Sequence, residues 1–226
     1  MTLFVIQLTA IGLASAADLP ANGTINLDGS TVAVRWDDGD TFKVVDTGAS
    51  ARLGGYNTLE NYGAVHRFGP GATELLRTSE RATTVATSQT WTCTTQEGGG
   101  GYGRIRVSCP DLAAQIVRQG LAHVFTVGSD ADQDLLSLQA QAIEDRVGMW
   151  AHGAPVGIVT SVHSVDEKAG QVATYNRVVS TTSGLSEKRV HSEVVPPCRW
   201  VCHDGSCLLY VPYSQRYGDG KAACLQ

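Results

Sequence analysis

One segment, residues 31–45, constrains the fold of this 226-residue chain more than any other. It reads Thr-Val-Ala-Val-Arg-Trp, then Asp-Asp-Gly-Asp, then Thr-Phe-Lys-Val-Val. β-branched and aromatic residues favour strands, and an Asp-Gly pair between two such runs is a strong hairpin signal. Residues 46–50 form a further turn signal and 51–53 begin a third strand, so the first part of the chain is predicted to be a β-meander.

The rest of the first 150 residues predicts helices mixed with two more strands. Residues 56–70, rich in glycine and asparagine, read as a loop. Apolar spacing and stop signals predict helices and strands in the following order: a helix at 71–87, strands at 89–95 and 104–109 joined by a glycine tip, and helices at 111–120 and 134–146. The predicted fold class is therefore α+β: a five-stranded barrel of the oligonucleotide/oligosaccharide-binding type with three helices.

Composition limits how such a barrel could bind nucleic acid. The chain is 42% hydrophobic and 17% charged, which is ordinary for a globular protein, and its formal net charge is -5. A broad basic surface is therefore excluded. Any binding of phosphates must depend on a small local cluster of arginines.

The amino-terminal residues indicate export. The first sixteen contain no charged side chain, residues 3–13 are largely apolar, and Ala14-Ser15-Ala16 is an A-x-A cleavage pattern. This pattern predicts a secretory signal peptide at residues 1–16, cleaved after Ala16, and a secreted or periplasmic protein without stable membrane insertion after cleavage. A buried strand or an uncleaved anchor is the alternative, although the apolar run is shorter than the ~20 residues that span a bilayer.

Six cysteines favour disulfides, because their number is even and export leads to an oxidising compartment. Cys93 and Cys109 flank the glycine tip and could be bridged if their strands pair in a suitable register. A zinc site is the alternative for the remaining group, although its C-x3-C-H-x3-C spacing differs from the usual paired C-x2-C arrangement. That group consists of Cys198, Cys202, His203 and Cys207.

Pro155 marks a predicted boundary in the chain. Residues 17–155 are expected to form the barrel domain. Residues 156–226 are rich in valine, serine and threonine, hold four of the six cysteines and show no clear helical period. They are expected to form a small β-rich, disulfide-linked appendage of unknown role. It either caps the barrel or binds a partner or a component of the cell envelope.

Four motifs occur in a fixed order between the first hairpin and Trp150. They are D-G-D-T at 38–41, R-L-G-G-Y-N-T-L-E at 52–60, Y-G-R at 102–104, and V-R-Q-G-L-A at 117–122 followed by G-M-W at 148–150. Each motif alone is weak, but the ordered combination is specific. Over about residues 31–152 the chain resembles the thermonuclease family, whose best-known member is staphylococcal nuclease.

The residue types in these motifs suit the hydrolysis of a phosphodiester, which becomes more negative as water attacks phosphorus. Arg52 and Arg104 lie on different strands, and each presents a planar fork of donors to phosphate oxygens. Glu60 can hold or deprotonate the attacking water. Asp40, with the oxygens of residues 57 and 58, suits a hard cation such as Ca²⁺.

The resemblance assigns a role to each of these positions. It implies that Arg52 and Arg104 are the catalytic arginines and Glu60 the catalytic glutamate. Asp40 and the backbone carbonyl of Thr58 would bind the metal. In addition, Tyr102 would contact phosphate as a substrate-binding residue, and Asp38 would be a supporting carboxylate.

Two departures from the family pattern matter most, besides the absence of a family tyrosine after the V-R-Q-G-L-A segment, where Phe125 and Thr126 lie. Asn57 replaces the second metal-binding aspartate, so one negative charge is lost and calcium affinity should fall, which leaves another divalent ion possible. Leu59 replaces the proline before the catalytic glutamate, which loosens that loop. Both changes bear on the metal and the loop more than on the type of reaction.

The expected function is that of a secreted, metal-dependent nuclease that acts as a monomer. It would hydrolyse DNA, RNA or both with little sequence specificity, and the resemblance implies 3′-phosphate products. The alternative is a non-catalytic nucleic-acid-binding or scaffold module on the same barrel. Asn57 favours that alternative, whereas the presence of Arg52, Glu60 and Arg104 counts against it.

Overall fold

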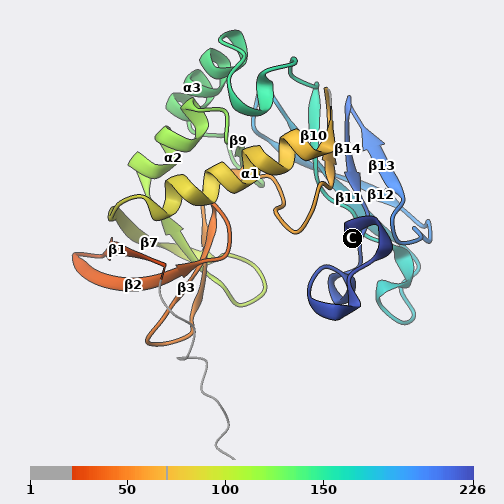
Figure 1. Cartoon of the computed structure of the whole chain (residues 1–226), viewed down its shortest axis with the longest axis horizontal. Coiled ribbons are helices and arrows are strands. Elements are labelled where there is room, and N and C mark those ends of the chain that lie inside the picture. Colours follow the sequence, from red (N-terminus) through yellow and green to blue (C-terminus); the bar gives the residue numbers. More distant parts are fainter. Residues whose placement is uncertain (1–21, 70) are drawn as a thin grey trace, which may run out of the picture.

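The computed structural model describes residues 22–69 and 71–226 of the chain (Figure 1). The predicted signal peptide lies outside these residues. The described part contains a closed β-barrel, three α-helices and a β-rich C-terminal region. None of its helices has the length and apolar character needed to cross a membrane.

The barrel closes in the strand order β1-β2-β3-β4-β8-β7. The predicted barrel type is confirmed, and it contains six strands where five were expected. The additional strand is β1, which pairs antiparallel with β2 and parallel with β7 and so closes the sheet. The strands are β1 (Gly23–Leu27), β2 (Ser30–Trp36), β3 (Thr41–Val44), β4 (Ser50–Leu53), β7 (Trp91–Gly99) and β8 (Ile105–Ser108).

Alternation along the first hairpin fills the barrel interior. Val34, Trp36 and Phe42 point inward and are almost completely buried, and the rings of Trp36 and Phe42 lie 5.0 Å apart between centroids. Burial of large apolar side chains of this kind contributes about 1.5–3 kcal/mol per residue. The hairpin that was predicted from its Asp-Gly turn therefore also supplies the centre of the barrel core.

All three predicted helices are present, with ends within two residues of those expected. They are α1 (Ala72–Thr87), α2 (Pro110–Arg118) and α3 (Gln133–Glu144). The first turn of α3 is capped by Asp132, whose side chain accepts hydrogen bonds from the backbone N–H groups of residues 134 and 135. In Figure 1, α1 extends from above the barrel toward the C-terminal sheets.

The prediction that residues 56–70 form a loop was partly wrong. Within this segment, β5 (Gly55–Thr58) pairs antiparallel with β9 (Ala122–Phe125), and β6 (His66–Arg67) pairs with β14 (Ser206–Leu209). Glycine and asparagine give the segment a loop-like composition. The partner strands that make it extended are far away in the sequence, so no local pattern reveals them.

The C-terminal region consists of two small antiparallel sheets. One contains β10 (Gly157–Ser161), β11 (Thr174–Ser180) and β12 (Ser186–His191), and the other contains β13 (Trp200–His203), β14 and β6. Tyr62 and Val65, from the segment between β5 and β6, are buried in the same apolar cluster as Leu208 and Val211. The region thus packs directly on the segment that joins β5 to α1.

All six cysteines form disulfides, which confirms the prediction. The pairs are Cys93–Cys109, Cys198–Cys224 and Cys202–Cys207. No free cysteine occurs in the part of the chain that the structure describes. The zinc alternative requires thiolate ligands, and the two C-terminal disulfides use all of those sulfur atoms.

Candidate active site

The Asp-Gly-Asp turn between β2 and β3 is fixed by the side chains around it. The backbone N–H of Asp40 donates a 2.9 Å hydrogen bond to Asp38 Oδ1. A Cβ atom at Gly39 would lie only 2.8 Å from the Cβ of Ala82 on α1 and 2.8 Å from Thr58 Cγ2. Glycine is therefore required for this turn to pack against α1 and β5.

Asp40 is completely buried and fully hydrogen-bonded. Its Oδ2 accepts bonds from the Thr58 backbone N–H (2.7 Å) and hydroxyl (3.0 Å). Its Oδ1 accepts a 3.0 Å bond from the Thr41 hydroxyl and a further bond from Arg52. A buried carboxylate needs such partners, because its desolvation is costly. Asp40 therefore ties β3, β4 and β5 together.

Arg52 lies on β4, directly opposite Thr41 in the strand register. Its Nη1 donates to Asp40 Oδ1 and, at 3.1 Å, to Thr41 Oγ1, and its Nη2 donates to Asn57 Oδ1. Burial lowers the pKa of Arg52, but the negative charges of Asp40, Asp38 and Glu60 raise the pKa overall. The guanidinium is thus always charged and held in one orientation, with 23% of the side chain exposed.

Arg104 follows the glycine tip between β7 and β8, and Gly100 lies close to both Arg104 and Arg52. A Cβ atom at Gly100 would lie 3.1 Å from the Cβ of Arg52 and 3.3 Å from the Cβ of Arg104. The pKa of Arg104 is lowered, first by burial and then by the positive charge of Arg52. Because the two positive charges repel each other, an anion bound between them would be stabilised.

Tyr102 is the predicted site residue that lies farthest into solvent, with 92% of its surface exposed. The guanidinium carbon of Arg104 lies 5.7 Å from the centroid of its ring. Tyr102 also has a positive φ of 52°, which fits its place at the tip of the hairpin. It is therefore available to a substrate that reaches Arg104.

Glu60 lies just after β5, on a loop that a buried histidine supports. Its backbone N–H donates a 3.0 Å bond to His66 Nε2. Burial, and after it the charge of His123, lowers the pKa of His66 to about 3, so this histidine is neutral and can accept the bond. The pKa of Glu60 itself is raised by burial, against the opposing effects of Arg216 and Arg52. A carboxylate with a raised pKa is a better proton acceptor than an ordinary one.

The predicted metal ligands lie together and are all oxygen donors, the type that a hard cation takes. Asn57 Nδ2 donates to the Thr58 carbonyl oxygen at 2.7 Å, and Asn57 Oδ1 accepts from Arg52. Within the described residues, no group of three or more His, Cys, Asp and Glu side chains is arranged to hold a metal. These oxygen atoms are therefore of the type that binds a divalent cation. To bind them, the cation has to displace Arg52 from Asp40 and Asn57.

Several supporting residues were not found from the sequence. His123 lies opposite Asn57 in the β5–β9 register, with its Nε2 3.4 Å from Asn57 Nδ2. Tyr56 donates its hydroxyl to the Gly39 carbonyl at 2.8 Å. Ser79 of α1 donates to the carbonyl of residue 59 at 2.6 Å. These contacts depend on the β5–β9 pairing and on helix packing, so the motifs alone did not indicate them.

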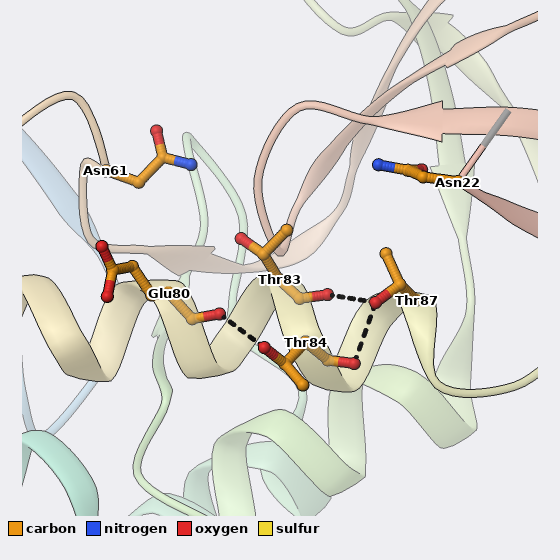
Figure 2. Close-up of a pocket in the computed structure, with 6 residues that line it drawn as sticks. All are labelled: Asn22, Asn61, Glu80, Thr83, Thr84 and Thr87. Carbon is orange, nitrogen blue, oxygen red and sulfur yellow. Dashed lines mark hydrogen bonds between the residues drawn. The ribbon is translucent and has the colours of Figure 1, made fainter. Parts of the chain in front are cut away.

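A polar hollow of about 510 Å³ lies away from these residues, between α1 and the start of β1 (Figure 2). Asn22, Asn61, Glu80, Thr83, Thr84 and Thr87 line it. The hydroxyls of Thr84 and Thr87 bond to carbonyl oxygens of α1 itself, at 3.1 Å each. The donor protons of these two hydroxyls are thus used within the helix, and none of the predicted catalytic or metal-binding residues lines this hollow.

Comparison with known proteins gives one match and one negative result. Residues 45–152 match the family model described as staphylococcal nuclease homologue. The matched range contains Arg52, Asn57, Glu60 and Arg104, whereas Asp40 precedes it and the C-terminal region follows it. No curated protein matches the chain.

Proposed function

We propose, from the premise that residues 45–152 form a staphylococcal nuclease homologue domain, that this protein is a secreted, metal-dependent nuclease. It would hydrolyse phosphodiester bonds of DNA, RNA or both. The observation that carries the proposal is that Arg52 and Arg104 both lie beside Gly100, and that the charge of Glu60 is among those that raise the pKa of Arg52.

The two arginines would stabilise the charge that develops on the phosphate. Arg52 is charged and is held at the site by hydrogen bonds to Asp40, Thr41 and Asn57, and a cation bound to Asp40 and Asn57 would release it toward the phosphate. Arg104 approaches from the hairpin tip and brings a second fork of donors. An anion between them also relieves their mutual repulsion.

Glu60 would orient or deprotonate the attacking water. Its loop is held at the Glu60 N–H by His66 and at the Leu59 carbonyl by Ser79. These two bonds position the loop despite the absence of a proline before the glutamate. Burial favours proton uptake by Glu60, as a general base requires.

We propose that a divalent cation, Ca²⁺ in the first instance, binds to Asp40, Asn57 Oδ1 and the Thr58 carbonyl. When bound, it would polarise a phosphate oxygen as a Lewis acid. Asn57 is neutral, so the site has one carboxylate fewer than an aspartate there would provide, and another divalent ion remains an option. In either case Arg52 becomes free to turn toward the phosphate.

The proposed substrate contacts are to phosphates, so little sequence specificity is expected. Tyr102 would contact a phosphate near Arg104. The products would carry 3′-phosphate ends, as the family resemblance implies, and the enzyme would act as a monomer.

Three disulfides support the proposal that the protein functions in an oxidising compartment, secreted or periplasmic. The proposed organisation is a signal peptide at 1–16, a barrel domain at 17–155 and an appendage at 156–226. Because Tyr62 and Val65 are buried among C-terminal residues, we further propose that the appendage is needed for the stability of the barrel's own loop.

A non-catalytic nucleic-acid-binding module is the second candidate function. One observation favours it: the oxygens of Asp40 and Asn57 that a cation would use are bonded to Arg52. In that case the arginines would bind phosphates without any cleavage.

The decisive experiment is digestion of single-stranded DNA by the purified mature protein with Ca²⁺, with EDTA, and as Glu60→Gln with Ca²⁺. We expect cleavage that requires the metal and falls by a factor of about 10² or more in the variant. Glu80→Gln, at an exposed position of α1, is the matched control and should retain activity. Absence of cleavage with both Ca²⁺ and Mn²⁺ would leave the binding module as the better description.

A further inference from the structure

A short C-terminal turn, residues 213–217, lies against the loop that carries Glu60. Tyr62 comes two residues after Glu60, and the guanidinium carbon of Arg216 lies 4.6 Å from the centroid of its ring. Arg216 also donates its Nε to the Val211 carbonyl at 3.0 Å. The turn and the catalytic loop are therefore joined by a stacked pair of side chains.

Three tyrosine rings form a continuous row at this junction. The rings of Tyr62 and Tyr217 lie 6.1 Å apart, and those of Tyr217 and Tyr213 lie 6.2 Å apart, both edge to face. Tyr62 is buried, but Tyr213 is 77% exposed and Tyr217 is 54% exposed. The outer two rings contribute little to the core, so packing alone does not account for them.

Arg216 adds a positive charge to this row of rings. Within the described residues, its two Nη nitrogens make no hydrogen bond and it forms no ion pair within 4.0 Å. Its charge nevertheless lowers the pKa of Glu60 more than Arg52 or Arg104 does, although burial raises that pKa overall. Arg216 thus lies beside Tyr62, which is on the loop that carries Glu60, and forms no ion pair with that carboxylate. A phosphate would find free donors there.

We propose that Tyr213, Arg216 and Tyr217 form a subsite for one nucleotide of a single-stranded nucleic acid. The inference rests on the proposed nuclease function and specifies its substrate class. Arg216 would bind a phosphate next to the one that is cleaved, and the exposed tyrosines would stack on a base. In a duplex both faces of each base are already stacked on neighbours, so the tyrosines would have nothing to bind. The C-terminal region would then be part of the active site.

Binding measurements test the subsite without requiring cleavage. The full-length chain with Glu60→Gln is titrated in EDTA against a fluorescein-labelled oligonucleotide, as a single strand and as its duplex, with anisotropy as the readout. Adding Tyr213→Ala and Tyr217→Ala together should weaken single-strand binding at least about tenfold and duplex binding less than about twofold. The same pair changed to phenylalanine should keep the affinity, because stacking does not need the hydroxyl.

Two further variants control for unrelated effects. Tyr175→Ala removes an aromatic ring that lies beside Arg177 and Lys188 instead of the catalytic loop, and it should leave both affinities unchanged. Arg216→Gln should weaken binding of both forms about fivefold and reduce the salt dependence of binding. Unfolding in urea verifies that the folds are comparable.

The inference is overturned if the double alanine variant binds the single strand as tightly as its parent. It is also overturned if single strand and duplex lose affinity equally, or if the parent fails to bind a single strand. Failure of the proposed function gives a different result, because the wild-type protein would then bind the single strand but not cleave it.

Discussion

The barrel and the C-terminal region each carry an arginine whose charge lowers the pKa of Glu60, and they hold these arginines by different means. Arg52 lies on a barrel strand and donates to three side chains, one of which is the buried Asp40. Arg216 lies after a short 3₁₀ turn, where one backbone carbonyl and the ring of Tyr62 hold it. Arg52 neutralises a buried carboxylate and so contributes to the stability of the fold. The position of Arg216 depends instead on how the C-terminal segment is fixed.

The cores of the two regions differ in the same way. The barrel cluster contains 23 buried residues and is crossed by one disulfide, whereas the C-terminal cluster contains 11 and lies beside two. Small cores commonly rely on disulfides because they bury too little apolar surface. Substitutions at barrel-site residues bonded to the buried Asp40 should therefore alter stability and chemistry together, whereas those at Arg104 on the exposed tip, or in the C-terminal region, should separate them.

The largest expected effect comes from Arg52→Ala. Cleavage should fall by a factor of about 10²–10³, because a charged donor to the transition state is lost. The free energy of unfolding should fall by about 3–5 kcal/mol, because Asp40 stays buried without its counter-ion. Cleavage kinetics and urea unfolding measure the two losses.

Arg104→Ala is the matched comparison for that variant. It should lose similar activity but change the free energy of unfolding by less than about 0.5 kcal/mol, since the one hydrogen bond that its side chain makes is at the exposed tip. Equal stability losses in the two variants would show that Asp40 does not depend on Arg52.

A somewhat smaller effect is expected from removal of the Cys198–Cys224 disulfide by serine at both positions. The bridge spans 26 residues, and loss of its constraint on the unfolded chain should cost about 3.5 kcal/mol. The Cys202–Cys207 bridge spans 5 residues and should cost only about 2 kcal/mol. Urea unfolding of the two double-serine variants measures the difference, and the opposite ranking would contradict the idea that the long bridge fixes the segment of Arg216.

Acid should weaken the junction between the two regions through His66. Its pKa is about 3 in the folded protein and 6.5 ordinarily, so below pH 6.5 the unfolded chain takes up a proton that the folded chain does not. The stability present above pH 6.5 is therefore lost as the pH falls toward 3, by about 2 kcal/mol at pH 5.

His66→Gln should remove this part of the pH dependence while it keeps an acceptor for the Glu60 N–H. Unfolding free energies at pH 7.5 and pH 5 measure it. His152→Gln, at a surface position bonded to Glu74, serves as the control. If the free energy of unfolding of His66→Gln still falls as much between pH 7.5 and pH 5 as that of the wild-type protein, another group causes the acid sensitivity.

The smallest effect should come from Asn57→Asp on the barrel side. Restoring a second carboxylate near Asp40 should tighten Ca²⁺ binding about tenfold, or about 1.4 kcal/mol. Titration calorimetry measures it. Asn61→Asp adds the same charge on the following loop and should change the affinity much less; equal gains would mean that Asn57 is not a ligand.

The sequence predicted the fold and the candidate site best where a secondary-structure pattern and a family motif occur in the same segment. The Asp-Gly hairpin and the helical periodicity predicted the barrel and all three helices, and the order of the motifs selected Asp40, Arg52 and Glu60. Pairing of β5 with β9 and of β6 with β14 could not be predicted, because each joins segments far apart in the chain. The same pairings bring His123 to Asn57 and the C-terminal turn to Tyr62, so those contacts were also missed.

The pairing of β6 with β14 has a consequence for when the proposed nuclease would become active. Residues 198–224 are synthesised long after Glu60 and Arg104, and the bond between Cys198 and Cys224 that ties their two ends together forms only on oxidation. If these residues complete the substrate site as proposed, a chain still on the ribosome or in a reducing cytosol lacks the subsite that binds the single strand. The producing cell would then be shielded from its own nuclease until export, without the need for a separate inhibitor.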